Sequence, residues 1–274
     1  MRILVRTSKW AIWARRIASF ALPLVVLPVF MHRERLITSA AFHVVELAAA
    51  GFALLGALLG IVAMFRLWHS GDRGWDRAVI GLLLSLVCLA PFAYVALQAA
   101  RYPLVLDVAT DDRDPPPLTL AAPPLGSVDA VLAIAAAFPN VKTRLYPLNA
   151  LQSFDIVAGL AAARGWDIRQ RREPATVLGE GQVSAVATTL LGWRDEVVLR
   201  VRGDPAGSIV DMRSASLASL HDLGANGQRI EDFLVALDAE VTLLMRDNPA
   251  AVQPLDGIIE EPAEPVEEGA EGGG

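Results

Sequence analysis

The segment Val44–Phe65, VVELAAAGFALLGALLGIVAMF, decides the fold of the N-terminal part of this chain, and Glu46 is its only formally charged residue. Two further apolar segments, Ile17–Met31 and Ala78–Ala100, lie on either side of it and contain no charged residue. About 20 helical residues cross the hydrocarbon core of a bilayer, because each residue adds about 1.5 Å. The second and third segments are long enough, so the sequence predicts a protein held in a membrane.

The first segment, Ile17–Met31, has only 15 residues and needs a separate argument. The apolar stretch Trp10–Trp13 precedes it, and the long side chains of Arg15 and Arg16 can reach back to the lipid headgroups. We therefore expect a retained span and a bundle of three transmembrane helices over residues 1–100. A cleavable signal peptide is the alternative, but two prolines interrupt the segment and no small-residue cleavage site follows it.

The distribution of basic residues predicts the orientation of the bundle. Basic residues precede the first segment and separate the second from the third, whereas the loop after the first segment holds only Arg33 and Arg35, partly offset by Glu34. The basic residues before the first segment are Arg2, Arg6, Lys9, Arg15 and Arg16, and those between the second and third segments are Arg66, Arg73 and Arg77. By the positive-inside rule the N-terminus is cytoplasmic, and an odd number of spans places everything after Arg101 outside. We expect an inner-membrane protein with a periplasmic domain.

Polar features inside the predicted spans are few. Gly56 and Gly60 form the small-residue spacing that lets helices approach closely, and we expect packing within the bundle rather than a dimerisation face. Glu46 and His43 lie near the outer end of the second span. We expect Glu46 at the interface, facing headgroups or the arginines of the first loop, rather than as a functional site within the membrane. No string of buried polar residues crosses the spans, which argues against a pump or channel.

Composition excludes several classes of protein. Hydrophobic residues make up 54% of the 274 residues, and the mean hydropathy of +0.42 is high for a soluble domain. The net charge of −6 depends on seven carboxylates after residue 249; without them it is +1, and no basic face indicates nucleic acid. Cys88 is the only cysteine and the four histidines are scattered, so no disulfide or metal site is expected, nor any cofactor.

The chain after the spans divides into three parts. Residues 101–126 form a proline-rich connector, in which the clustered aspartates fit turns and caps better than a calcium loop. Residues 127–247 are predicted as one α+β domain. Residues 248–274, rich in Pro, Glu, Ala and Gly, are predicted to be disordered because they lack an apolar period.

Hydrophobic periods predict the elements of the α+β domain, which is expected to be a four-stranded antiparallel sheet with helices on one face. Helices are expected at Ser127–Phe138, at Ala150–Arg164 (ended by Gly165) and at about Ala225–Met245. The strands are expected at Trp166–Arg172, Val183–Leu191, Glu196–Arg202 and Ser208–Ala215, with turns at Gly179–Gly181 and Gly203–Gly207.

Several linked motifs in this region resemble those of the domain-of-unknown-function family 1499. They are Ile209-Val-Asp-Met-Arg213-Ser-Ala-Ser216, Asp222-Leu-Gly-Ala-Asn226, Arg229-Ile230, Gly192-Trp-Arg-Asp195-Glu-Val-Val-Leu-Arg200-Val, and Asp107-Val-Ala-Thr-Asp111 with Pro115-Pro116. The stretch Trp68-x-x-Gly71-x-x-Gly74 is similar to the longer, membrane-anchored members. The chain departs from the pattern at Leu217 and at Leu220-His221. The resemblance implies an architecture, and no activity is established for the family.

The motif residues are candidates for a binding site. Asp211 and Arg213 share a face of one strand, Arg200 and Arg202 share a face of the next, and Asp222 to Asn226 would cap the last helix beside them. The candidate binding residues are Arg200, Asp211, Arg213, Ser214, Ser216, Asp222, Asn226 and Arg229. One interpretation is an anion site for phosphate, carboxylate or a lipid headgroup. The other, favoured, is an Asp–Arg lattice that joins strand to helix, with Asp195, Asp211 and Asp222 as partners.

Two functions follow from these residues. The favoured one is a non-catalytic binding or assembly module of the cell envelope, in contact with the lipid bilayer and with another membrane protein or an anionic lipid headgroup. The alternative is an enzyme acting on an anionic envelope substrate through the same Arg/Asp cluster. A hydrolase built from Ser214 or Ser216 with His221 and Asp222 is disfavoured, because no Gly-x-Ser-x-Gly turn is present and His221 is expected at the surface. An Arg213 already paired with aspartates would favour the first function.

Overall fold

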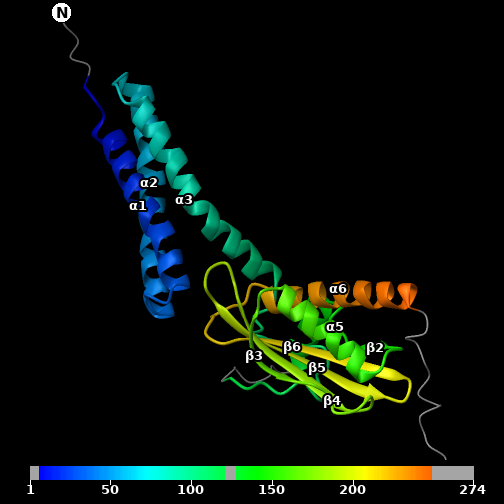
Figure 1. The fold of residues 1–274 in the computed structure, drawn as a ribbon. Coiled ribbons are helices and arrows are strands. Elements are labelled where there is room, and N and C mark those ends of the chain that lie inside the picture. The colour runs from blue at the N-terminus through cyan, green and yellow to red at the C-terminus, as the bar shows by residue number, and fades with distance from the viewer. Residues whose placement is uncertain (1–5, 121–127, 249–274) are drawn as a thin grey trace, which may run out of the picture.

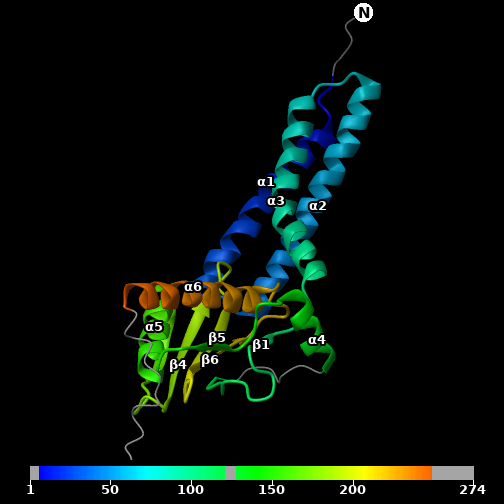
Figure 2. The ribbon, with the colours of Figure 1, turned by 90° about the vertical axis from the view of Figure 1, so that its right-hand side faces the viewer.

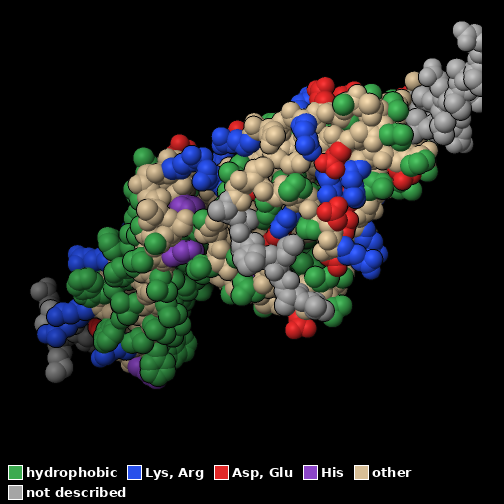
Figure 3. Space-filling model, turned by 90° about the horizontal axis from the view of Figure 1, so that it is seen from below, with side chains coloured by type: hydrophobic (Ala, Val, Ile, Leu, Met, Phe, Trp, Pro, Cys, Tyr) green, Lys and Arg blue, Asp and Glu red, His purple; other side chains and the backbone are tan. Residues whose placement is uncertain are grey.

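The computed structural model describes residues 6–120 and 128–248. Three long helices form a rod at one end, and the α+β domain, called the head below, lies at the other (Figure 1). The helices are α1 (Lys9–Arg33), α2 (Ser39–Ser70) and α3 (Trp75–Arg101). All three are long and apolar enough to cross a membrane. Hydrophobic side chains cover this rod, whereas charged and uncharged polar groups cover much of the head (Figure 3).

Small residues bring the three helices together. A Cβ atom on Gly56 would lie 2.5 Å from Ser85 Oγ of α3 and 3.3 Å from the backbone nitrogen of Ala18 in α1. A Cβ on Gly60 would lie 3.1 Å from Leu82 Cβ. Gly56 therefore faces both other helices of the bundle, and Gly60 faces α3. The predicted role of this pair in packing the bundle is confirmed.

The head has more strands than the sequence indicated. The main sheet order is β1-β6-β5-β4-β3, every pairing is antiparallel, and β2 also pairs with β6. The strands are β1 (Asp107–Ala109), β2 (Arg144–Tyr146), β3 (Asp167–Arg172), β4 (Glu180–Thr188), β5 (Arg194–Asp204) and β6 (Gly207–Ser216). The predicted four strands correspond to β3–β6. Both β1 and β2 have three residues, which is too short for a recognisable alternation, and each pairs with a strand more than sixty residues away.

The predicted start of β4 was wrong, and the reason is steric. Gly181 was predicted to lie in a turn, but it pairs with Val201 inside β4. A Cβ on Gly181 would lie 2.7 Å from both Phe154 and Pro174. The glycine is thus required by close packing and not by a turn. At the other end of β4, the turn before β5 contains Gly192 with a φ of 87°.

Helices cover one face of the sheet. α5 (Ala150–Ala163) and α6 (Ala225–Asp247) lie side by side on it (Figure 1), and α4 (Val128–Ala137) lies toward the bundle end of the head (Figure 2). Asn149 and Gln152 form a capping box at the start of α5. The predicted apolar face of α6 is buried, and it packs with α5 and the sheet into one core. The buried hydrophobic residues of α6 are Ile230, Phe233, Leu234, Leu237 and Val241.

Candidate functional site

The candidate residues divide between the two faces of the sheet. Side chains alternate along a strand, and directly paired residues share a face. Arg200 pairs with Asp211, so these two lie together; Ser216 pairs with Asp195, and both point to the opposite face, beneath α6. We call the first group the connector network, because residues 107–116 contact it, and the second the helix network.

Arg213 is the most completely paired arginine of the connector network. Its Nε and Nη2 donate to the two carboxylate oxygens of Asp107, at 3.0 and 2.6 Å, and its Nη1 donates to the carbonyl of Pro116 at 3.0 Å. Both charged side chains are buried. This two-pronged geometry is the strongest that a guanidinium group makes with a carboxylate. It ties the segment immediately after α3 to strand β6.

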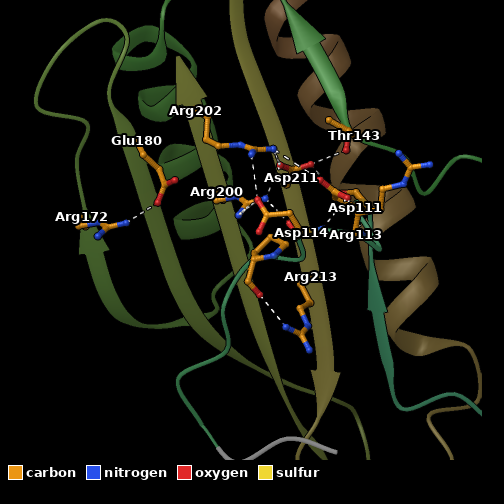
Figure 4. A network of polar contacts seen from close by, with 12 residues as sticks. Asp111, Arg113, Asp114, Thr143, Arg172, Glu180, Arg200, Arg202, Asp211 and Arg213 are labelled. Carbon is orange, nitrogen blue, oxygen red and sulfur yellow. Dashed lines mark hydrogen bonds and ion pairs between the residues drawn. The ribbon is translucent and has the colours of Figure 1, made fainter. Parts of the chain in front are cut away.

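Arg200 and Arg202 share Asp211 (Figure 4). Their Nη2 atoms lie 3.1 and 2.8 Å from Asp211 Oδ2, and the Nη1 atoms of both lie within 3.2 Å of Asp114 Oδ2. The other oxygen of Asp211 accepts hydrogen bonds from two threonine hydroxyls, of which Thr143 is the nearer at 2.6 Å. Asp211 has no exposed surface. The negative charge of Asp211 is therefore compensated by groups of the head and does not face solvent.

Asp111 holds the turn that brings Asp114 to these arginines. Its Oδ1 accepts from the backbone nitrogens of Arg113 and Asp114, at 3.0 and 3.2 Å. Partial burial by itself would raise the pKa of Asp111, but the two backbone donors and the charges of the nearby arginines outweigh it and lower the pKa. The predicted turn role of this aspartate is confirmed.

The helix network joins β5 and β6 to the start of α6. Arg229 Nη2 donates to Asp195 Oδ2 at 2.6 Å, and its Nη1 donates to Ser214 Oγ at 2.7 Å. Ser216 Oγ donates to Asp195 Oδ1 at 2.7 Å. Asn226, fully buried, donates to Ser216 Oγ and accepts from Ser214 Oγ. Each polar group thus has a partner within the head, in the arrangement expected of an Asp–Arg lattice.

Asp222 caps α6 and pairs with no arginine among the described residues. Its carboxylate accepts from the backbone nitrogens of Gly224 and Asn226, at 3.0 and 3.1 Å. Burial is the largest influence on this group and raises its pKa, against the two backbone donors. Of the three predicted lattice carboxylates, Asp195 and Asp211 pair with arginines and Asp222 serves the helix terminus.

The geometry gives the hydrolase interpretation little support. Ser214 and Ser216 hydrogen-bond to asparagine, arginine and aspartate, and in the described part of the chain neither serine contacts a histidine. His221 was expected at the surface, yet its side chain is only 19% exposed and its Nδ1 accepts from the backbone nitrogen of Leu223. Within residues 6–120 and 128–248, no three His, Cys, Asp or Glu side chains are grouped to hold a metal ion.

Two carboxylates of the connector network were missed from the sequence. Asp107 and Asp114 were assigned to turns of a connector, whereas they supply the carboxylates that Arg213, Arg200 and Arg202 require. The signal was present, because Asp107 belongs to one of the motifs that carry the family resemblance. What was lacking was the pairing of β1 with β6, which joins residues about a hundred positions apart.

The head is attached to the bundle through the turn between β4 and β5. His32 Nδ1, at the end of α1, lies 2.8 Å from the carbonyl oxygen of Leu191. The Trp193 ring lies 4.6 Å from the ring of His32 and is stacked 5.2 Å from that of His43. Arg33, one of the groups that Glu46 was predicted to face, donates instead to backbone carbonyls of the same turn. The first loop of the bundle is therefore a docking surface for the head.

Comparison with known proteins identifies one related group. The model of a family described as "Protein of unknown function (DUF1499)" matches residues 96–237, more than half of the chain. No curated protein and no solved structure matches the chain. The matched range begins in α3 and includes both networks. The predicted resemblance is confirmed, and the three apolar helices upstream support the membrane-anchored long form.

Proposed function

We propose, for a chain that belongs to the DUF1499 family of proteins of unknown function, a non-catalytic binding or assembly role in the cell envelope. The bundle holds the protein in the inner membrane with its N-terminus in the cytoplasm. The head lies on the periplasmic side and binds another component of the membrane. Binding by the arginine-containing networks themselves stays a prediction.

The pairing of Arg213 with Asp107 is the observation that carries this proposal. An enzyme for anionic substrates needs a guanidinium group that is free to meet the substrate. Here Nε, Nη1 and Nη2 of Arg213 all donate to atoms of the head. Arg229 is similarly engaged by Asp195, Ser214 and Asn226. These arginines fit a role in keeping the head rigid better than a role in chemistry.

Basic residues at the far end of the bundle support the orientation. Backbone hydrogen bonds join the N-terminal segment to the loop between α2 and α3, from Ser8 to Arg73 and from Arg73 to Arg6. This gathers the basic residues of both segments at the end of the rod opposite the head (Figure 1). Positive charge is retained on the cytoplasmic side. The head then belongs on the other side.

Protease accessibility tests the orientation. Protease added to intact spheroplasts is expected to remove the head, leaving a membrane-protected fragment of the three spans. A cytoplasmic protein and a periplasmic protein in the same sample serve as controls for lysis and for access. A head that resists cleavage until the cells are lysed would overturn the proposed location.

Site-directed photocrosslinking tests the binding role. Leu190 and Leu220 are 82% and 73% exposed on the head loops nearest the bundle, whereas Leu178 is exposed near Gly203 at the far end of the strands. A photoreactive residue at Leu190 or Leu220 is expected to capture a membrane protein reproducibly, and one at Leu178 is not. The Arg213→Ala variant should capture it only to the extent that its head remains folded. Equal capture from all three positions, or none, would count against a membrane-proximal binding surface.

A further inference from the structure

A cavity of about 390 Å³ lies where the bundle meets the head. All three spans contribute to its wall, together with the turn between β4 and β5 and the loop before α6. Figure 3 shows histidine side chains at this junction, between the hydrophobic rod and the head. In Figure 1 the C-terminal half of α3 diverges from α1 and α2, and Pro91 lies on the α3 wall of the cavity. The volume is within the range of about 300–1,000 Å³ typical of small-molecule sites.

The cavity is mainly apolar, and its few polar side chains lie toward the head. Helix direction gives the depth of each wall residue: α2 runs away from the head, so His43 and Glu46 lie nearer the head than Ala50. The helices α1 and α3 run toward the head, so Val25 and Pro91, which come before the ends of these helices, lie at the end of the cavity farther from the head. An amphiphile standing in a bilayer has the same polarity along the same direction.

Three polar atoms at the end of the cavity nearer the head have no hydrogen-bond partner among the described residues. They are His43 Nε2, Glu46 Oε1 and Ser219 Oγ, all inaccessible to solvent. Buried polar atoms of native proteins are almost always paired, with protein, water or a ligand. All three residues line this one cavity, so the unpaired polar groups of this region belong to a single site.

We propose that this cavity binds a membrane glycerolipid with an ammonium headgroup, of the phosphatidylethanolamine class. Its wall belongs to the spans, several of whose wall side chains are also exposed on the bundle surface, such as Leu47 and Val95, so the bilayer is the source of the occupant. None of the described lining residues is Lys or Arg, while Glu46 supplies a carboxylate. A cationic donor therefore suits the site better than a purely anionic headgroup. His43 and Ser219 are then the donors available to the lipid phosphate or ester oxygens.

The Arg-containing networks take no part in this site, so it does not rest on the proposed partner or on the orientation of the bundle. Failure of lipid binding would leave the proposed function untouched, and a head found in the cytoplasm would leave the cavity and its lipid in place.

Photoreactive lipids reconstituted with the full-length protein test the proposal. Vesicles of phosphatidylcholine carry a trace of one diazirine-tailed lipid, with an ethanolamine, choline or glycerol headgroup, and labelled peptides are identified after illumination. Labelling around Val25, Ala50 and Val95 is expected to be about tenfold stronger with ethanolamine than with choline, which corresponds to ~1.4 kcal/mol. Equal labelling by the three lipids, or a preference for the anionic glycerol headgroup, would overturn the proposal.

Two variants and one control variant show where the lipid binds. Ala50→Phe places a ring in the cavity and is expected to abolish the labelling, whereas Ala48→Phe, the same change at an exposed position of the same helix, is expected to leave it unchanged. Glu46→Gln keeps the shape of the side chain and removes its charge. This variant should still be labelled but lose the preference for ethanolamine over choline. Retention of that preference by Glu46→Gln, or of labelling by Ala50→Phe, would show that the lipid binds elsewhere.

Discussion

Arg213 and Asp107 form a buried pair whose value depends on both members being present. Removing one partner of such a pair leaves an uncompensated charge in the interior. We expect Arg213→Ala to lower the free energy of unfolding of the head by about 3–5 kcal/mol. The measurement is a urea titration of the full-length protein in mild detergent, with brief proteolysis reporting the folded fraction of the head.

Two controls distinguish the effect of leaving a buried charge unpaired from the effect of removing any charge. Arg172 and Glu180 form an ion pair 2.8 Å apart in which both side chains are about half exposed, so Arg172→Ala should cost less than about 1 kcal/mol. Replacing both members of the buried pair, Arg213→Met with Asp107→Leu, should cost less than Arg213→Ala alone, because no unpaired charge remains. A double variant that is as unstable as the single one would contradict this explanation.

Asp111 connects head stability to pH. Its pKa in the folded protein lies below the ordinary value of 3.8, so the folded state binds the proton less readily than the unfolded chain. Its contribution to stability is complete above that ordinary value and is lost as the pH falls through the lowered pKa. The advantage of the wild type over Asp111→Asn in free energy of unfolding should therefore narrow as the pH falls below about 4. A gap that stays constant down to pH 2 would show that the carboxylate charge is not involved.

At the scale of elements, the turn between β4 and β5 is shaped for contact with α1. Gly192 has a φ of 87°, and a Cβ there would lie 2.7 Å from Arg33 Cα. Gly192→Ala should therefore strain the backbone and push the turn away from the bundle. Faster amide hydrogen exchange in residues 189–193, with the sheet unchanged, is the expected result.

Gly159→Ala is the matched control for Gly192→Ala. It lies in α5, and nothing is within 4 Å of a Cβ placed on it. Gly159→Ala should stabilise the head by about 0.5–1 kcal/mol, because alanine loses less conformational freedom in a helix than glycine does. Similar effects of the two alanines would mean that the contact with Arg33 is unimportant.

At the scale of the whole molecule, head and bundle are joined by an aromatic contact. Trp193 of the head packs against Phe42, His32 and His43 of the bundle. Trp193→Ala should loosen this junction while leaving both parts folded, so hydrogen exchange should rise in residues 30–43 and 189–193 but not in β5 or β6. Trp68→Ala, at a 77% exposed position near the other end of α2, is the control and should change none of these regions. Exchange that rises throughout the head would indicate unfolding and not undocking.

Local patterns in the sequence predicted what depends on neighbouring residues. The three apolar helices, the strands β3–β6, the buried face of α6 and the helix end at Gly165 all follow from periods and terminal signals within a few residues. The tail predicted to be disordered, residues 248–274, lies outside the described part of the chain from residue 249 onward. The network residues between Asp195 and Arg229 were also found, because they belong to motifs that are close together along the chain.

Only the tertiary structure decided how these pieces meet. Arg200 and Ser214 were expected around one site, but the register of β5 against β6 sends them to opposite faces of the sheet. Asp107 and Asp114 became arginine partners once β1 paired with β6, and Glu46 and Ser219 met at one cavity once the head docked on the bundle. Such contacts join residues far apart in the chain, and they depend on strand register and on the packing of complete elements. A short stretch of sequence determines neither.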